Sequence, residues 1–306
     1  MKYQRIILTS GYSKLILLII TMLFGYFLCI FLALIITNLA GYHDIIAKIT
    51  NLNYTDQETL DLFRIFQIAM HMGLFLVGPL LYILLVEPDP INRYGINKSP
   101  LNLNYLLIFV LGFVCIPGLN FTHTLNEALR LPGWLNGAEK WMQEKENTAQ
   151  DLTDAMLKMK TFKDLLINLI LFGFLPALGE ELVFRGALFS ILKDWTGRKH
   201  LTVFISAFVF AAIHIQFYGF LPRFLMGVGF GYLFIFTGSL WAPIFAHFLN
   251  NTVAVVAAFF YYQGKSTVSQ DDFGTVNNLA VNLFSIVLSI YIFRVIYRRS
   301  LSARST

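Results

Sequence analysis

The chain has 306 residues, of which 57% are hydrophobic and only 13% are charged, and its mean hydropathy is +0.64. Soluble globular domains carry about twice that share of charged residues, so this composition excludes a disordered chain and predicts an integral membrane protein. The formal net charge of +5 belongs to the loops of such a protein, and nucleic-acid binding is a poor explanation of it.

Eight apolar stretches are long enough to be membrane spans, each of which needs about 20 residues. They cover residues 15–41, 65–86, 105–121, 165–192, 201–217, 220–236, 240–262 and 279–296. The first stretch is too long for the apolar region of a signal peptide, so we expect it to remain as a span. The predicted fold class is all-α, a polytopic integral membrane helical bundle with about eight transmembrane helices.

The loops divide by charge, and this division predicts the orientation of the chain. An even number of spans places both termini on one side. Assigning that side to the cytoplasm gathers basic residues such as Lys14, Arg93, Lys193 and Arg298 inside, while most acidic residues collect outside. This is the asymmetry of the positive-inside rule. We therefore predict a multi-pass protein of the cell membrane, the cytoplasmic membrane in a bacterium, with the lipid bilayer as its first partner.

The chain is expected to form a single integral membrane domain over residues 1–306. Three N-terminal spans lie in residues 1–121, an extracytoplasmic amphipathic segment in 122–164, a core that contains the unusual polar residues in 165–262, and the last span with a basic cytoplasmic tail in 263–306. The amphipathic segment mixes aromatic and charged residues, which is typical of helices lying on a membrane surface. Within it, Thr148 and Asp151 have the spacing of a helix capping box.

Three ionisable residues interrupt the fourth span, where residues 179–186 read Gly-Glu-Glu-Leu-Val-Phe-Arg-Gly. An unpaired charge near the bilayer centre costs about 2.5 to 3.5 kcal/mol, so such groups usually face a protein interior or a water-filled cavity. Glu181 and Arg185 are four residues apart, which favours an ion pair. Glu180 is turned about 100° from Glu181 and is predicted to be the free carboxylate. Pro176, just upstream, predicts a kink that opens room beside the carboxylates.

Two of the six histidines are candidates for the same site. His214 lies on the fifth predicted span and His247 on the seventh, with Asn251 one helical turn beyond His247. The other four are set aside because they lie in exterior loops, at a boundary or in the outer half of a span: His43, His123, His200 and His71.

Depth in the membrane supports convergence of the candidates. At 1.5 Å per residue, Glu180, His214, His247 and Asn251 lie about 12 to 21 Å from the cytoplasmic ends of their spans. A lone histidine in a membrane helix is more often a packing residue than a catalyst. Polar residues from three helices in one layer are better explained by a shared site.

A glutamate, two histidines and an asparagine suffice for hydrolysis of an amide bond by water. Glu180 can accept a proton from the attacking water, and Asn251 can donate a hydrogen bond to the developing oxyanion. His214 and His247 either position that water or bind a divalent metal, most naturally zinc. The sequence has no His-Glu-x-x-His motif, so a metal would need ligands from separate helices. The spacing leaves metal-dependent and metal-free chemistry open.

With these motifs in order, the chain resembles the CPBP family of intramembrane proteases. That family includes the type II CAAX prenyl endopeptidases, the Abi proteins linked to bacteriocin self-immunity, and proteins similar to lysostaphin resistance protein A. Its motif Glu-Glu-x-x-x-Arg matches Glu180, Glu181 and Arg185. Its motif Phe-x-x-x-His matches Phe210 and His214, and His-x-x-x-Asn matches His247 and Asn251. The match covers roughly residues 165–260.

The resemblance implies a helical bundle with a conical cavity open to the cytoplasmic leaflet, and an endopeptidase acting on membrane-associated peptides or proteins, some of them lipidated. It implies Glu180 as the base, His214 and His247 as groups that position water or a metal, and Asn251 as the oxyanion donor. Glu181, Arg185 and Phe210 are expected to be structural. The family is labelled metal-dependent, which the sequence of this chain does not decide.

Two functions of other classes stay open as alternatives. One is a non-catalytic membrane scaffold or immunity protein that keeps the motifs for folding. The other is a proton-coupled transporter that uses Glu180, His214 and His247 as a relay. The sequence shows no paired inverted repeat of interrupted spans, which disfavours the transporter.

Overall fold

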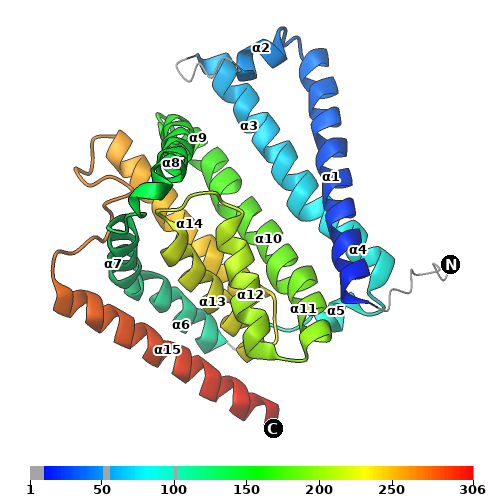
Figure 1. The fold of residues 1–306 in the computed structure, drawn as a ribbon, viewed down its shortest axis with the longest axis vertical. Helices are drawn as coiled ribbons and strands as arrows, with labels where there is room; N and C mark the ends of the chain where they lie inside the picture. Colours follow the sequence, from blue (N-terminus) through cyan, green and yellow to red (C-terminus); the bar gives the residue numbers. More distant parts are fainter. Residues whose placement is uncertain (1–9, 51–55, 100–101, 306) are drawn as a thin grey trace.

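A computed structural model describes residues 10–50, 56–99 and 102–305, and the regular elements of these residues are all helices (Figure 1). In chain order they are α1 (Gly11–Leu39), α2 (Ile45–Thr50), α3 (Gln57–His71), η1 (Met72–Val77), α4 (Gly78–Val86), α5 (Pro90–Arg93), α6 (Asn102–Val114), α7 (Ile116–Glu127), η2 (Gly133–Leu135), α8 (Asn136–Leu157), α9 (Phe162–Asn168), η3 (Leu169–Phe174), α10 (Leu175–Glu181), η4 (Leu182–Leu188), α11 (Phe189–Thr196), α12 (Lys199–Ala212), α13 (Phe220–Thr237), α14 (Trp241–Tyr262) and α15 (Leu279–Ser305). The predicted all-α fold class is confirmed.

The number of spans differs from the prediction. Six helical stretches of the described chain are long and apolar enough to cross a membrane: Gly11–Leu39, Gln57–Val86, Phe162–Thr196, Phe220–Thr237, Trp241–Tyr262 and Leu279–Ser302. Helices α6 and α7 add a seventh if they are counted as one span bent by 43°. At the fifth predicted span, α12 has only 14 residues. Such a helix is about 21 Å long, less than the hydrocarbon thickness of about 30 Å, so the predicted eight spans are not confirmed.

The start of α1 and the end of α15 lie at the same end of the bundle. Ring contacts connect the helix ends there: Tyr12 with Trp195 at 4.4 Å, His200 with Tyr232 at 5.8 Å, and Phe236 with Tyr297 at 4.8 Å. This arrangement is the one expected of a chain with both termini on one side of a membrane. That this side is the cytoplasm stays a prediction from the loop charges.

An ion-pair network ties helices together at the same end. Arg93 contacts Glu87 at 3.0 Å and also Asp194 at the end of α11, while Lys14 at the start of α1 lies 3.4 Å from Asp194. Burial raises the pKa of the Glu87 carboxyl, and the charge of Arg93 opposes that shift. The network therefore compensates a buried carboxylate while it joins the first helix to the central one.

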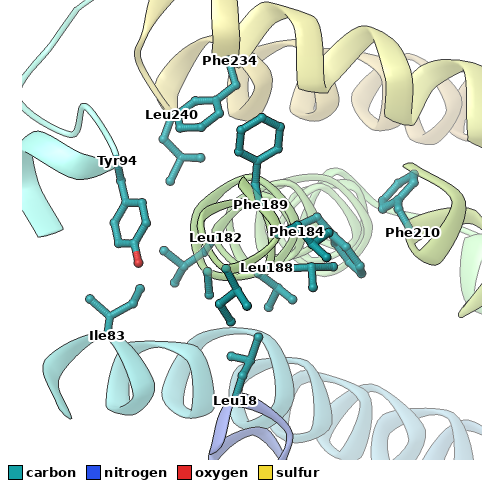
Figure 2. Close-up of a cluster of buried hydrophobic side chains, with 14 of the residues drawn as sticks. Leu18, Ile83, Tyr94, Leu182, Phe184, Leu188, Phe189, Phe210, Phe234 and Leu240 are labelled. Atoms are coloured by element: carbon teal, nitrogen blue, oxygen red, sulfur yellow. The ribbon is translucent and has the colours of Figure 1, made fainter. Parts of the chain in front are cut away.

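The helical stretch Phe162–Thr196, formed by α9 to α11 with η3 and η4, is the centre of the molecule. Its apolar window is 56% buried inside the protein, against 17% for α1, so it is the span best shielded from lipid. Figure 2 shows its side chains packed between those of the surrounding helices, with these residues labelled: Leu18, Ile83, Tyr94, Leu182, Phe184, Leu188, Phe189, Phe210, Phe234 and Leu240. Charged groups on this helix can therefore be kept away from lipid by protein.

Three glycines bring α1 into backbone contact with the neighbouring helix, at one side of the bundle in Figure 1. A Cβ atom on Gly25 would collide with the carbonyl oxygen of Gly73, and one on Gly73 would collide with that of Gly25. A Cβ atom on Gly78 would collide with the backbone of Met22. Small residues allow this close approach of membrane helices. The contact fixes η1, which begins directly after His71.

The segment between α7 and α9 contains one long helix, α8. The capping box predicted at Thr148 and Asp151 in this segment is wrong. Thr148 lies inside α8, where its hydroxyl donates to the Glu144 carbonyl at 2.8 Å, so it caps no helix. The capping box is formed by Thr161 and Asp164 at the start of α9. Both pairs have the same spacing, and the uninterrupted helical run through Thr148 decides between them.

We predict that Gly25→Ala lowers the free energy of unfolding by about 1 to 3 kcal/mol, because the added methyl group meets backbone that cannot move aside. The measurement is the thermal unfolding midpoint in detergent. Gly137→Ala on α8 is the matched control, since a Cβ atom there has no neighbour within 4 Å. Equal midpoints for the two variants would contradict the proposed tight packing of α1.

Candidate active site

The helix that carries Glu180 is widened on both sides of it. Seven α-helical residues, α10, lie between the π-helical stretches η3 and η4. The first stretch precedes Pro176, and η1 likewise precedes Pro79. Proline removes one backbone hydrogen bond and clashes with a carbonyl of the preceding turn, which widening relieves. The predicted kink at Pro176 is thus a π-helical turn within a continuous helix, a feature frequent at functional sites.

Glu181 is the buried acceptor of two cationic or polar partners. Its Oε1 atom accepts a hydrogen bond from Nη1 of Arg185 at 2.8 Å and lies 2.9 Å from Nδ1 of His247. The Glu181 and Arg185 side chains are 0% and 1% exposed. The ion pair expected from the sequence is therefore present, and His247 from α14 joins it.

Arg185 is held on every side by groups that suit a guanidinium. Its Nη2 atom donates to the carbonyl oxygen of Gly227 on α13 at 2.8 Å. Its central carbon lies 4.9 Å from the ring centre of Phe210 and 5.3 Å from that of Phe230. Cation–π contacts and a backbone acceptor compensate the desolvated charge.

Glu180 is buried next to Glu181 and faces a different set of partners. Its Oε1 atom lies 3.5 Å from Nε2 of His71, and its Oε2 atom lies 3.9 Å from Nε2 of His247. The Oε2 atom is buried and accepts no hydrogen bond from any described residue. One carboxylate oxygen is thus directed at an imidazole without being bonded to it.

His71 is not among the site residues predicted from the sequence, whereas the structure places it next to Glu180. It is the last residue of α3, 109 positions before Glu180, and its side chain is 13% exposed. Its position in the outer half of the second predicted span gives no information about which neighbouring helix its side chain faces. The signal that could have found it is an ionisable residue within a span, which by itself suggests a functional site.

His214 lies in a turn after α12 and is not on a helix as predicted. The helix ends at Ala212, and the Nδ1 atom of His214 lies 2.7 Å from the Phe210 carbonyl oxygen. Ile215, which follows, has a φ of 52°, a conformation that β-branched residues rarely adopt. Such strain is often found at functional sites. His214 and Glu180, both described residues, share no hydrogen bond or ion pair.

The ring of Phe210 connects the two predicted histidines. It lies edge-on to His214 at 5.1 Å and to His247 at 5.9 Å, measured between ring centres. His247 is also stacked on Phe230 at 5.0 Å. The Phe-x-x-x-His motif therefore supplies a phenylalanine whose ring packs against both imidazoles.

Asn251 has a definite partner in the structure. Its Nδ2 atom donates to the carbonyl oxygen of Phe172 in η3 at 3.0 Å, and its Oδ1 atom lies 3.4 Å from Nδ2 of Asn250. The π-helical stretch shifts the backbone hydrogen bonds of the central helix, and Asn251 supplies one of its carbonyls with a donor. The second N–H of the amide remains available for another acceptor.

Two cavities reach α14 beside this asparagine. One is apolar, has a volume of about 230 Å³ and lies among α6, α7, α13 and α15. The other is polar, has a volume of about 910 Å³ and lies among α7, α8 and the segment before α15. Leu119, Met226 and Asn250 line both. The polar cavity is at the bundle end predicted to be extracytoplasmic, whereas the resemblance implied a cavity open to the cytoplasmic leaflet.

The donor groups do not fit a metal centre. In the part of the chain that the structure describes, no three or more side chains of His, Cys, Asp or Glu are grouped as metal ligands would be. The Phe210 ring contacts both of the predicted ligands, His214 and His247.

Comparison with known proteins finds a family that is similar to one segment of the chain. Residues 162–253 match the family described as type II CAAX prenyl endopeptidase Rce1-like. The protein named "Putative membrane peptidase YdiL" from Bacillus subtilis (strain 168) is 34% identical over 77 residues, which are 25% of this chain and 31% of that protein. No solved structure matches the chain significantly. The family resemblance predicted from the motifs is confirmed for this segment, and the chain aligns with about a third of the relative's length.

We predict that Arg185→Met lowers the free energy of unfolding by about 3 to 5 kcal/mol, because it leaves the Glu181 carboxylate buried without its cation. Methionine keeps most of the apolar stem, so lost packing contributes little. The measurement is chemical or thermal unfolding in detergent. Arg64→Met is the control, since its partner Asp61 is 42% exposed and can be hydrated. Similar losses in the two variants would refute a special role of the buried pair.

Proposed function

We propose that the chain is an intramembrane endopeptidase, because residues 162–253 match the family described as type II CAAX prenyl endopeptidase Rce1-like. It hydrolyses peptide bonds of membrane-associated peptides or proteins, with water activated by Glu180. The observation that carries this proposal is the buried Oε2 atom of Glu180, which no described residue bonds and which faces His247 at 3.9 Å.

Glu181 supports the reaction by orienting His247. Its carboxylate is 2.9 Å from Nδ1 of the imidazole, so the proton of the neutral ring resides on Nδ1. The Nε2 atom then has a free lone pair directed toward Glu180. In this tautomer His247 can accept a hydrogen bond from the attacking water, while Glu180 accepts the proton that the water loses.

In the proposed reaction Glu180 accepts one proton and later returns it. Water transfers a proton to Oε2 of Glu180 and its oxygen bonds to the peptide carbonyl carbon. Glu180 then returns the proton to the leaving nitrogen as the C–N bond breaks, which yields a carboxylic acid and an amine. The remaining N–H of Asn251 is the proposed donor to the oxyanion, and His214 is the proposed second group that positions the substrate or water.

We predict that Glu180→Gln lowers the rate of peptide cleavage by about 100-fold or more, because an amide cannot accept the proton. The probe is an internally quenched farnesylated peptide ending in Cys-aliphatic-aliphatic-X, assayed with protein in liposomes. Membrane proteomes of cells with the wild-type protein and with the variant are compared for new peptide ends.

Glu127→Gln is the matched control, since this exposed carboxylate also lies 3.5 Å from a histidine, His123. Full cleavage by a folded Glu180→Gln protein, on the probe and in the proteome, would refute Glu180 as the base. If the wild-type protein cleaves nothing and the Glu180→Gln protein keeps its biological activity, the endopeptidase is refuted and the scaffold or immunity alternative holds. Solute uptake that depends on Glu180 without any cleavage would support the transporter.

The divalent metal predicted from the sequence needs its own test. If zinc takes part through His214 and His247, exhaustive chelation lowers cleavage and added zinc restores it. Elemental analysis of the purified protein measures bound metal directly. Unchanged cleavage by a metal-free protein would remove the metal from the proposal and leave the roles of Glu180 and His247 intact.

A further inference from the structure

We infer that His71 is the positioning residue of Glu180, holding its Oε1 atom so that Oε2 is the oxygen that exchanges protons. The inference rests on the proposed role of Glu180 as the base. His71 lies outside residues 162–253, the segment that the family comparison covers.

The geometry places an imidazole on each side of the carboxylate. His71 approaches Oε1 from α3 at 3.5 Å, and His247 approaches Oε2 from α14 at 3.9 Å. The shorter contact is at the outer limit of a hydrogen bond, and such contacts in active sites commonly tighten when substrate binds. Nε2 of His71 is buried and has no hydrogen-bond partner among the described residues, and the acidic group that it approaches is the Glu180 carboxylate.

The surroundings of His71 are built to keep its ring in place. The imidazole is stacked on Phe75 at 4.7 Å with an angle of 29° between the planes. Phe75 in turn limits the central helix, because a Cβ atom on Gly179 would come within 2.8 Å of its Cβ atom. His71, Phe75, Gly179 and Glu180 thus form a closed set of contacts between two widened helices.

A packing histidine would not need this placement. Packing explains the stacking on Phe75 but not a nitrogen directed at a buried carboxylate that has no arginine or lysine within ion-pair distance among the described residues. Glu181 has Arg185 at 2.8 Å, whereas the titratable groups closest to Glu180 are His71 and His247. His214, Arg185 and Arg223 interact with Glu180 at longer range. By donating to Oε1, His71 favours the ionised carboxylate and keeps its own proton throughout the reaction.

The first test compares two substitutions of His71. His71→Leu removes the donor, and His71→Gln restores an N–H near the same place. We expect His71→Leu to lower kcat for the farnesylated peptide about 10-fold or more with KM within about twofold, and His71→Gln to recover most of the loss. His123→Leu, which breaks the exposed contact with Glu127 at the same 3.5 Å distance, should behave as wild type. Equal activity of the Leu and Gln variants would overturn the inference.

The second test does not depend on a substrate. A hydrophobic carbodiimide modifies protonated carboxyl groups, and mass spectrometry of the detergent-solubilised protein measures modification of Glu180 as a function of pH. In His71→Leu we expect the labelling curve to extend to higher pH by about one unit, because the carboxylate has lost its donor. His71→Gln and His123→Leu should follow the wild type.

The two tests separate the inference from the proposed function. If labelling shifts in His71→Leu but the wild-type protein cleaves neither the probe nor any membrane protein, the endopeptidase is refuted and the His71–Glu180 contact is supported. An unchanged labelling curve in His71→Leu would overturn the inference even if the peptide is cleaved. If His71→Leu does not fold, the same comparison is made between His71→Gln and wild type, and a shifted curve in His71→Gln overturns the inference.

Discussion

The buried carboxylate of Glu181 is the constraint on which the centre of this molecule depends. It lies in the most shielded span, where an uncompensated charge would cost several kcal/mol. Arg185 neutralises it from one turn below, and His247 approaches the same oxygen from α14. The compensation therefore connects two helices and orients the imidazole that faces Glu180. The contacts of the Glu181 carboxylate therefore stabilise the fold and orient the site at the same time.

The widened turns place the remaining groups around that centre. Pro176 and Pro79 each follow a π-helical stretch, and the carbonyls within such stretches need new donors. Asn251 supplies one to Phe172 in η3, and Ser206 supplies one to Phe184 in η4 at 2.9 Å. Side chains from α14 and α12 thus donate to carbonyls of the π-helical stretches. These hydrogen bonds connect the packing of the two helices to the geometry of the site.

The predictable part of the site was the part encoded within single helices. Spacing of four residues predicted the pairing of Glu181 with Arg185, and motif order predicted that α10 and α14 meet. His214 was misplaced because α12 ends at Ala212, five residues before the end of the predicted span 201–217. His71 was missed because its partner is on another helix, and periodicity within one helix says nothing about which neighbour its face meets.

The sequence by itself determined the fold class, the family segment and the pairing of charges within the fourth span. These follow from composition, motif order and helical periodicity, which are local properties of the chain. Only the tertiary structure decided that Glu180 lies between His71 and His247, and that Asn251 bonds to the backbone of η3. Those contacts depend on how bent and widened helices pack, which is set by glycine approaches such as Gly25 against Gly73 and by the burial of charge.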